Sequence, residues 1–154
     1  NREFSEDEDE LPKTQNEIAK SDLFQQPKDY KAKKRILVVE DDSTSRDVIN
    51  LFLKNLYDVS FAENGETALK SIEDKQLDLI IMDINLGSGI NGIEVTERIR
   101  KTGGYESIPI IAATAFAMLG DREKFLSNGF DHYISKPYLK TQWVKLLSDI
   151  FNKN

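Results

Sequence analysis

The segment Asp78–Asp83, with the sequence Asp-Leu-Ile-Ile-Met-Asp, is a short apolar run that ends in a carboxylate. A bounded apolar run of this length is typical of a strand that is buried on both faces. The carboxylate at its tip has no role in apolar packing, and a helix cap is its structural alternative. Charged residues follow two other apolar runs in the same way, namely the triplet Glu40–Asp42 and the single residue Lys136. Together these residues predict an acidic metal pocket with one lysine beside it.

Strand-like and helical patterns alternate along the chain from Arg35 to Phe151. The predicted strands are Arg35–Glu40, Asp58–Ala62, Leu77–Met82, Ile108–Ala113 and Asp131–Ser135. The predicted helices begin near Ser43, Asn64 and Gly92, and the last two cover about residues 117–127 and 141–151. Five strands that alternate with five helices favour the α/β class. They predict a doubly wound, five-stranded parallel sheet with helices on both faces.

Local signals refine two of these elements. The first predicted helix carries an apolar stripe that runs from Val48 to Leu56, and either Asp42 or Ser43 caps its N-terminus. After the last strand, Pro137 follows Lys136 directly, which fits a cis bond that aims the lysine inward, although most such bonds are trans.

Composition limits the class of function. The formal net charge of −6 argues against a nucleic-acid surface, and no stretch approaches the length of about 18 apolar residues that spans a bilayer. The absence of cysteine excludes disulfides and thiolate metal sites, and it is compatible with a reducing, cytoplasmic setting. The acidic block Glu6–Glu10 marks residues 1–33 as a linker or tail that is disordered or weakly helical, which leaves residues 34–152 as one domain.

The predicted pocket has a specific chemistry. In a doubly wound sheet the functional crevice lies outside the carboxyl ends of the strands, where Glu40, Asp41 and Asp83 would meet. Their mutual repulsion is relieved by a hard divalent cation such as Mg²⁺, or Mn²⁺ in its place, held by Asp41 and Asp83 with Glu40 orienting a water. Asp83 would then be the nucleophile of a phosphoryl transfer. Lys136 would supply positive charge and Thr114 a hydroxyl to the phosphoryl oxygens.

These motifs resemble those of the receiver domains of two-component signalling systems. The run Ile36–Asp42 is similar to the acidic-pair motif of that family, and Asp78–Asp83 with Asn91-Gly92 is similar to its phosphoacceptor strand and loop. Ala112–Ala115 resembles the region of its switch threonine, and Tyr133–Pro137 resembles its aromatic switch and lysine-proline motif. The resemblance covers about residues 35–151, and all five motif positions occur in order.

The resemblance implies a flavodoxin-like, CheY-like fold with strand order 2-1-3-4-5. It implies that Asp83 is the phosphoacceptor and that Thr114 and Tyr133 form the switch. The backbone carbonyl of Asn85 becomes a metal ligand beside Glu40, Asp41 and Asp83. Phosphorylation would change the face made by the fourth helix, the fifth strand and the fifth helix.

Two departures from the family pattern affect these expectations. The loop after Asp83 reads Leu-Gly-Ser-Gly-Ile-Asn-Gly over residues 86–92, lacks proline and is one residue longer than usual, so we expect it to be more flexible. Phe116 lies where the family often has a polar residue that positions the attacking water. We therefore expect slow self-dephosphorylation.

The expected partner is a histidine kinase or a histidine phosphotransfer protein. His132, the only histidine, is predicted on a short strand rather than on an exposed helix face, and no nucleotide-binding loop is present. The protein would therefore receive phosphate from a partner's phosphohistidine, with no direct contact to nucleic acid or membrane. We expect a monomer or weak dimer in the cytoplasm, either free or tethered to a membrane-bound kinase.

Two settings and two other classes of function stay open. The start at Asn1 and the acidic segment favour the C-terminal receiver of a hybrid histidine kinase over a single-domain response regulator. An interaction module that works without phosphorylation is the main alternative. A phosphatase with an aspartyl nucleophile needs a second acid two positions after Asp83, and Asn85 stands there, so we expect no catalytic turnover by this chain alone.

Overall fold

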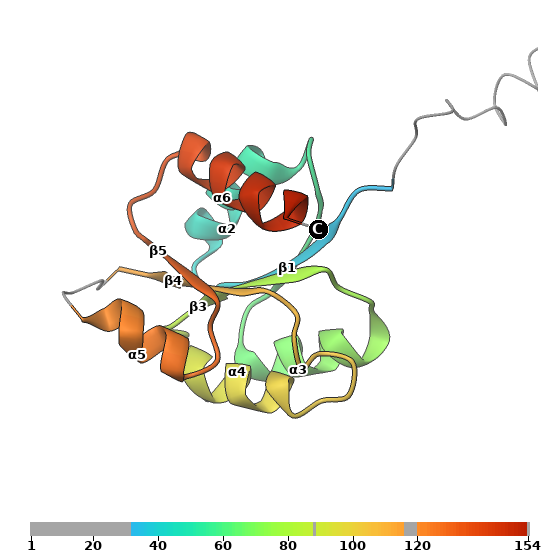
Figure 1. Ribbon diagram of the computed structural model, residues 1–154, viewed down its shortest axis with the longest axis vertical. Helices are drawn as coiled ribbons and strands as arrows, with labels where there is room; N and C mark the ends of the chain where they lie inside the picture. Colours follow the sequence, from blue (N-terminus) through green and yellow to red (C-terminus); the bar gives the residue numbers. More distant parts are fainter. Residues whose placement is uncertain (1–31, 88, 116–119, 154) are drawn as a thin grey trace, which may run out of the picture. The chain divides into compact units, whose positions relative to one another are not determined.

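A single parallel sheet forms the centre of the structure, a computed structural model that describes residues 32–87, 89–115 and 120–153 (Figure 1). Its strands are β1 (Arg35–Val39), β2 (Asp58–Ala62), β3 (Leu79–Asp83), β4 (Ile110–Thr114) and β5 (His132–Ser135). They pair in the order β2-β1-β3-β4-β5, and every pairing is parallel. The sequence prediction of fold class and strand order is therefore confirmed. Except for residues 32 and 33, the predicted linker lies outside the described ranges.

Helices cover both faces of this sheet. α2 (Ser43–Leu53) and α6 (Lys140–Asn152) lie on one face, and α3 (Gly65–Asp74), α4 (Gly92–Arg100) and α5 (Asp121–Ser127) lie on the other (Figure 1). Alternate residues of the central strands point into two separate apolar cores: Ile80 and Met82 face α3 to α5, whereas Leu79 and Ile81 face α2 and α6. β3 and β4 are buried throughout, as expected for parallel strands between two helical layers.

Most predicted boundaries lie within a few residues of the observed ones, and the bounds of β2 agree fully. The prediction that the apolar stripe of the first helix extends to Leu56 is wrong. α2 stops at Leu53, whose carbonyl accepts the amides of both Leu56 and Tyr57 in a turn that leads the chain into β2. Leu56 is consequently 48% exposed. Of the helix predicted at residues 117–127, residues 117–119 lie outside the described ranges.

Three helices that start near the carboxyl ends of the strands have side-chain N-caps. Asp42 accepts a hydrogen bond of 2.8 Å from the amide of Ser45 at the start of α2, which confirms it as the N-cap. Asn64 and Asn91 cap α3 and α4 in the same way. Each cap satisfies an amide that has no partner inside its helix. The helix N-termini therefore gather at the sheet edge where the predicted site residues lie.

Arg100 joins three segments at the end of the sheet opposite to the predicted site. Its guanidinium donates from Nη2 to the carbonyl of Gly129 at 2.7 Å and to Asp131 Oδ2 at 2.8 Å. It also donates from Nη1 to the carbonyl of Ile108 at 2.5 Å. The planar fork of an arginine can satisfy several acceptors at once. The end of α4 is thereby tied to the loops that lead into β4 and β5.

We predict that Arg100→Ala lowers the free energy of unfolding by about 2 kcal/mol or more, because it removes several charge-assisted hydrogen bonds and leaves their acceptors without this donor. Urea unfolding measures this loss. Arg98→Ala, at an exposed position in the same last turn of α4, is the matched control and should change stability by less than about 0.5 kcal/mol. Equal effects of the two substitutions would contradict the role of the Arg100 contacts.

Candidate metal centre

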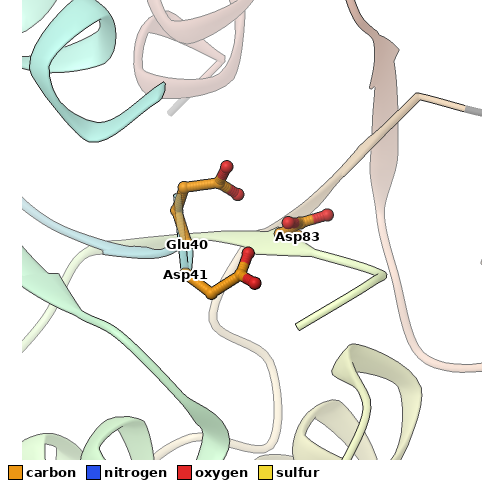
Figure 2. Close-up of side chains that lie close together, drawn as sticks. All are labelled: Glu40, Asp41 and Asp83. Atoms are coloured by element: carbon orange, nitrogen blue, oxygen red, sulfur yellow. The ribbon is translucent and has the colours of Figure 1, made fainter. Parts of the chain in front are cut away.

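Three carboxylates meet at the carboxyl ends of two neighbouring strands (Figure 2). Glu40 and Asp41 directly follow β1, and Asp83 is the last residue of β3. One carboxylate oxygen from each residue lies within 4.8 Å of the others, so that a single ion could contact all three. Glu40 and Asp83 are buried, at 2% and 6% exposure, whereas Asp41 is exposed. The structure thus brings together the three acids that the sequence indicated.

Backbone contacts hold the Glu40–Asp41 segment in place. The amide of Glu40 donates to the carbonyl of Ala62 at 3.0 Å, which continues the pairing of β1 with β2. The Nη1 atom of Arg46, one turn into α2, donates to the carbonyls of Glu40 and Asp41 at 2.8 and 3.0 Å. The sequence analysis missed Arg46, because an arginine in the first turns of a helix is otherwise an ordinary surface residue.

Lys136 lies beside the acids, as predicted. Its Nζ atom is 3.1 Å from Glu40 Oε1 and 3.7 Å from Asp83 Oδ2, so one ammonium group bridges two buried carboxylates. The Lys136-Pro137 peptide bond is cis. The amide of Lys136 donates to the carbonyl of Thr114 at 2.8 Å and so fixes the loop after β5 against the end of β4.

The other predicted site residues occupy different surroundings. Thr114 ends β4 and is 2% exposed, and the amide of Asn85 donates to Asp83 Oδ1 at 3.1 Å. Tyr133 lies away from the acids on the outer strand β5, with 39% exposure and its ring centroid 6.0 Å from that of Phe125. Phe116, on which the expected slow dephosphorylation depends, lies outside the described residues.

The electrostatics of the cluster are unusual at Asp83. Burial, together with a hydrogen bond and charge repulsion from Glu40, raises the pKa of Asp83 to about 7, against the opposing influence of Lys136 and the Asn85 amide. Burial and the charges of Glu40 and Asp83 also raise the pKa of Tyr138. Tyr138 is a second residue that the sequence analysis missed, although it directly follows the lysine-proline pair.

The donor set fits a hard divalent cation. It consists of oxygen atoms alone, and Mg²⁺ prefers oxygen ligands. Two of the carboxylates are buried beside only one described lysine ammonium, so the site carries an excess of negative charge that a cation would neutralise. When bound, such an ion would supply positive charge that can polarise and orient a phosphoryl group. The geometry therefore defines a doubly wound α/β protein in which a cluster of carboxylates that could hold a metal ion lies at the carboxyl ends of the strands.

Comparison with known proteins identifies the family. The response regulator receiver domain family matches residues 36–148, and this chain belongs to it. The chain is 34% identical to the polar-differentiation response regulator DivK of Brucella anthropi over 115 residues, which cover 74% of this chain and 93% of that protein. It is 37% identical over 126 residues to the hybrid signal transduction histidine kinase I of Dictyostelium discoideum, which covers 77% of this chain but 7% of that protein.

Solved structures agree with this family. The receiver domain of a sensor histidine kinase from Pseudomonas aeruginosa, described with a magnesium ion in its active-site cleft, superposes with a TM-score of 0.70 at 35% identity. The match covers 77% of this chain and 97% of that domain. The chemotaxis protein CheY4 of Vibrio cholerae, at 24% identity and a TM-score of 0.72, shares the fold over 77% of this chain and 99% of its own. Among the described residues, no helix has both the length and the apolar character needed to cross a bilayer.

The raised pKa of Asp83 predicts how stability depends on pH in metal-free protein. The folded chain binds this proton more tightly than the unfolded chain, so the resulting stabilisation is present below about pH 4. It is lost as the pH rises through about 7. We expect Asp83→Asn to remove this loss and to be more stable than the parent protein at pH 8. Urea unfolding between pH 4 and 8, with chelator present, measures the difference.

Asp42→Asn is the control for this prediction, since the pKa of Asp42 is lowered by its hydrogen bond from the Ser45 amide. Its contribution has the opposite sign, because that stabilisation is lost as the pH falls. A parent protein whose stability does not decline between pH 4 and 8 would contradict the assignment to Asp83. Addition of Mg²⁺ should raise the stability of the parent protein at pH 8 more than that of Asp83→Asn.

Proposed function

We propose that this receiver domain is a phosphoryl-accepting switch in which Asp83 takes a phosphoryl group from the phosphohistidine of a partner protein. The observation that carries the proposal is the gathering of Asp83, the two other acids and Lys136 at one edge of the sheet. A metal ion and a lysine beside a carboxylate nucleophile are the parts that a phosphoryl transfer requires.

The proposed reaction is a substitution at phosphorus. A carboxylate oxygen of Asp83 attacks the phosphorus atom, the bond from phosphorus to the imidazole nitrogen breaks, and the imidazole leaves with its electron pair. Asp41, Asp83 and the Asn85 carbonyl would hold Mg²⁺, with Glu40 acting through a water. When bound, the ion supplies positive charge that favours the ionised form of Asp83 and neutralises the phosphoryl oxygens. Lys136 exchanges its contact with Glu40 for one with a phosphoryl oxygen.

The proposed output is a change of the face formed by α5, β5 and α6. The phosphoryl group would draw the Thr114 hydroxyl inward, and Tyr133 would fill the space that Thr114 leaves. The backbone hydrogen bond from Lys136 to Thr114 supports this coupling, because it joins the loop after β5 to the strand that carries the proposed switch threonine. Phosphorylation would then shift a pre-existing equilibrium between two packings.

The relatives support a two-component setting but include both of its forms. The DivK relative matches along nearly its whole length, whereas the Dictyostelium relative is a hybrid histidine kinase of which the matched part is a small share. We favour the hybrid setting, in the cytoplasm, on the acidic composition of the segment before residue 34. The partner is a histidine kinase or a histidine phosphotransfer protein, and the domain acts as a monomer or weak dimer.

An interaction module that works without phosphorylation is the second candidate for this fold. It needs neither a metal nor a reactive carboxylate, and it would tolerate the loss of an acid or of the lysine. In the described site one carboxylate oxygen each of Glu40, Asp41 and Asp83 lies within 4.8 Å of the others, and Lys136 contacts Glu40 and Asp83, which favours the phosphoryl-accepting function. The aspartyl phosphatase is disfavoured because the residue two positions after Asp83 is Asn85, whose amide side chain is no general acid.

We predict one added phosphoryl group per chain when the protein is incubated with Mg²⁺ and acetyl phosphate. Asp83→Asn should show no adduct, because it lacks the nucleophile. Asp78→Asn, which changes the acid at the other end of the same apolar run, is the matched control and should be phosphorylated like the parent protein. Intact-mass spectrometry measures the adduct. A phosphate-release assay should show that release stops near one phosphate per chain.

Two results would contradict the proposal. Absence of the adduct, together with failure to bind beryllofluoride in the presence of Mg²⁺, would favour the interaction module. An adduct that persists in Asp83→Asn would place the phosphoacceptor elsewhere.

A further inference from the structure

Gly87, in the loop after β3, lies directly against the exposed carboxylate of the metal centre. A Cβ atom built on Gly87 would lie 2.7 Å from Asp41 Oδ2, closer than such atoms approach in proteins. Any side chain at this position would therefore collide with one of the three acids. The backbone φ angle of Gly87 is also positive, at 75°, a conformation that L side chains rarely adopt.

The backbone of Asp41 cannot move away from such a collision without breaking other contacts. Its carbonyl accepts a hydrogen bond from Arg46, and the next residue, Asp42, is held as the N-cap of α2. The preceding residue, Glu40, is paired through its amide with the end of β2. The side chain of Asp41 is consequently the only part of this residue that is free to rotate.

The loop that carries Gly87 is also anchored on both sides. Leu86, directly before it, is 3% exposed and belongs to the core against α3 to α5. On the far side, Ile90 packs against the same core and the amide of Gly92 donates to the carbonyl of Ile84 at 3.1 Å. A side chain at position 87 would therefore displace the Asp41 carboxylate rather than the loop.

We infer that Gly87 is a positioning residue for the metal centre: its lack of a side chain lets the Asp41 carboxylate share one ion with Glu40 and Asp83. The inference rests on the proposed function, because it assumes that these acids bind a divalent cation. According to this inference, the loop after β3 affects metal affinity, and Gly87 is the residue through which it does so.

A neighbouring glycine separates this effect from backbone strain. Gly89 lies in the same loop with a φ angle of 83°, and a Cβ atom built on it would meet nothing within 4 Å. Gly87→Ala and Gly89→Ala therefore introduce a similar unfavourable backbone conformation. They differ in that the first also collides with Asp41.

The experiment is a titration of each purified variant with Mg²⁺ by isothermal calorimetry, supported by Mn²⁺ binding followed by electron paramagnetic resonance. We expect Gly89→Ala to bind both ions with nearly the affinity of the parent protein. Gly87→Ala should bind them about tenfold or more weakly, the size of effect seen when the support of a metal ligand is lost. The metal-free melting temperatures of the two variants should be similar, because only the flexible end of the Asp41 side chain has to move.

The outcomes are distinct. Equal metal affinities of Gly87→Ala and Gly89→Ala would overturn the inference and leave the metal centre intact. Failure of the parent protein to bind either ion would overturn the metal centre of the proposed function, and the inference with it. If Gly87→Ala does not fold, the double variant with Asp41→Ala decides the matter: restored folding supports the collision, and continued failure to fold overturns it.

Discussion

The structure places three negative charges where apolar strands end, and their repulsion is the constraint on which the site depends. Glu40 and Asp83 are nearly without solvent, so water does little to screen them. Lys136 relieves part of this repulsion by contacting both. Burial, together with the hydrogen bond and the remaining repulsion from Glu40, raises the pKa of Asp83. A site of this kind is unfavourable until it gains further positive charge, which a divalent cation would supply.

The rest of the fold keeps these charges from separating. β1 and β3 are adjacent, buried and parallel, so the residues that follow them must emerge side by side. Capped helices begin at the same edge, and the partial positive charge of their N-termini favours nearby anions. Arg46 and the amide of Asn85 add donors close to the acids. The contacts that hold the acids in place are thus also contacts that stabilise the fold.

The sequence predicted the features that follow from periodicity and strand topology. The five strands and the meeting of Glu40, Asp41 and Asp83 required only that apolar runs form parallel strands and that the acids follow them, whereas the strand order was implied by the resemblance to receiver domains. Leu56 was misplaced because a turn ended α2 before the apolar stripe did. Tyr138 and Gly87 were missed for a different reason. Their importance lies in contacts between segments that are distant along the chain, and a residue type alone carries no information about such contacts.

The arrangement also explains how chemistry at Asp83 could reach a distant surface. Lys136 belongs to the loop after β5, yet it contacts Glu40 through its side chain and Thr114 through its amide. In the proposed switch, a change in the partner of its ammonium group would therefore act on the end of β4 and on the loop after β5 at once. Tyr133 lies three residues earlier on β5, with its ring near Phe125 of α5. A packed connection of this length has few ways to absorb a displacement, since close-packed side chains move between discrete arrangements. The proposed switch thus requires only that two such arrangements lie within a few kcal/mol of each other.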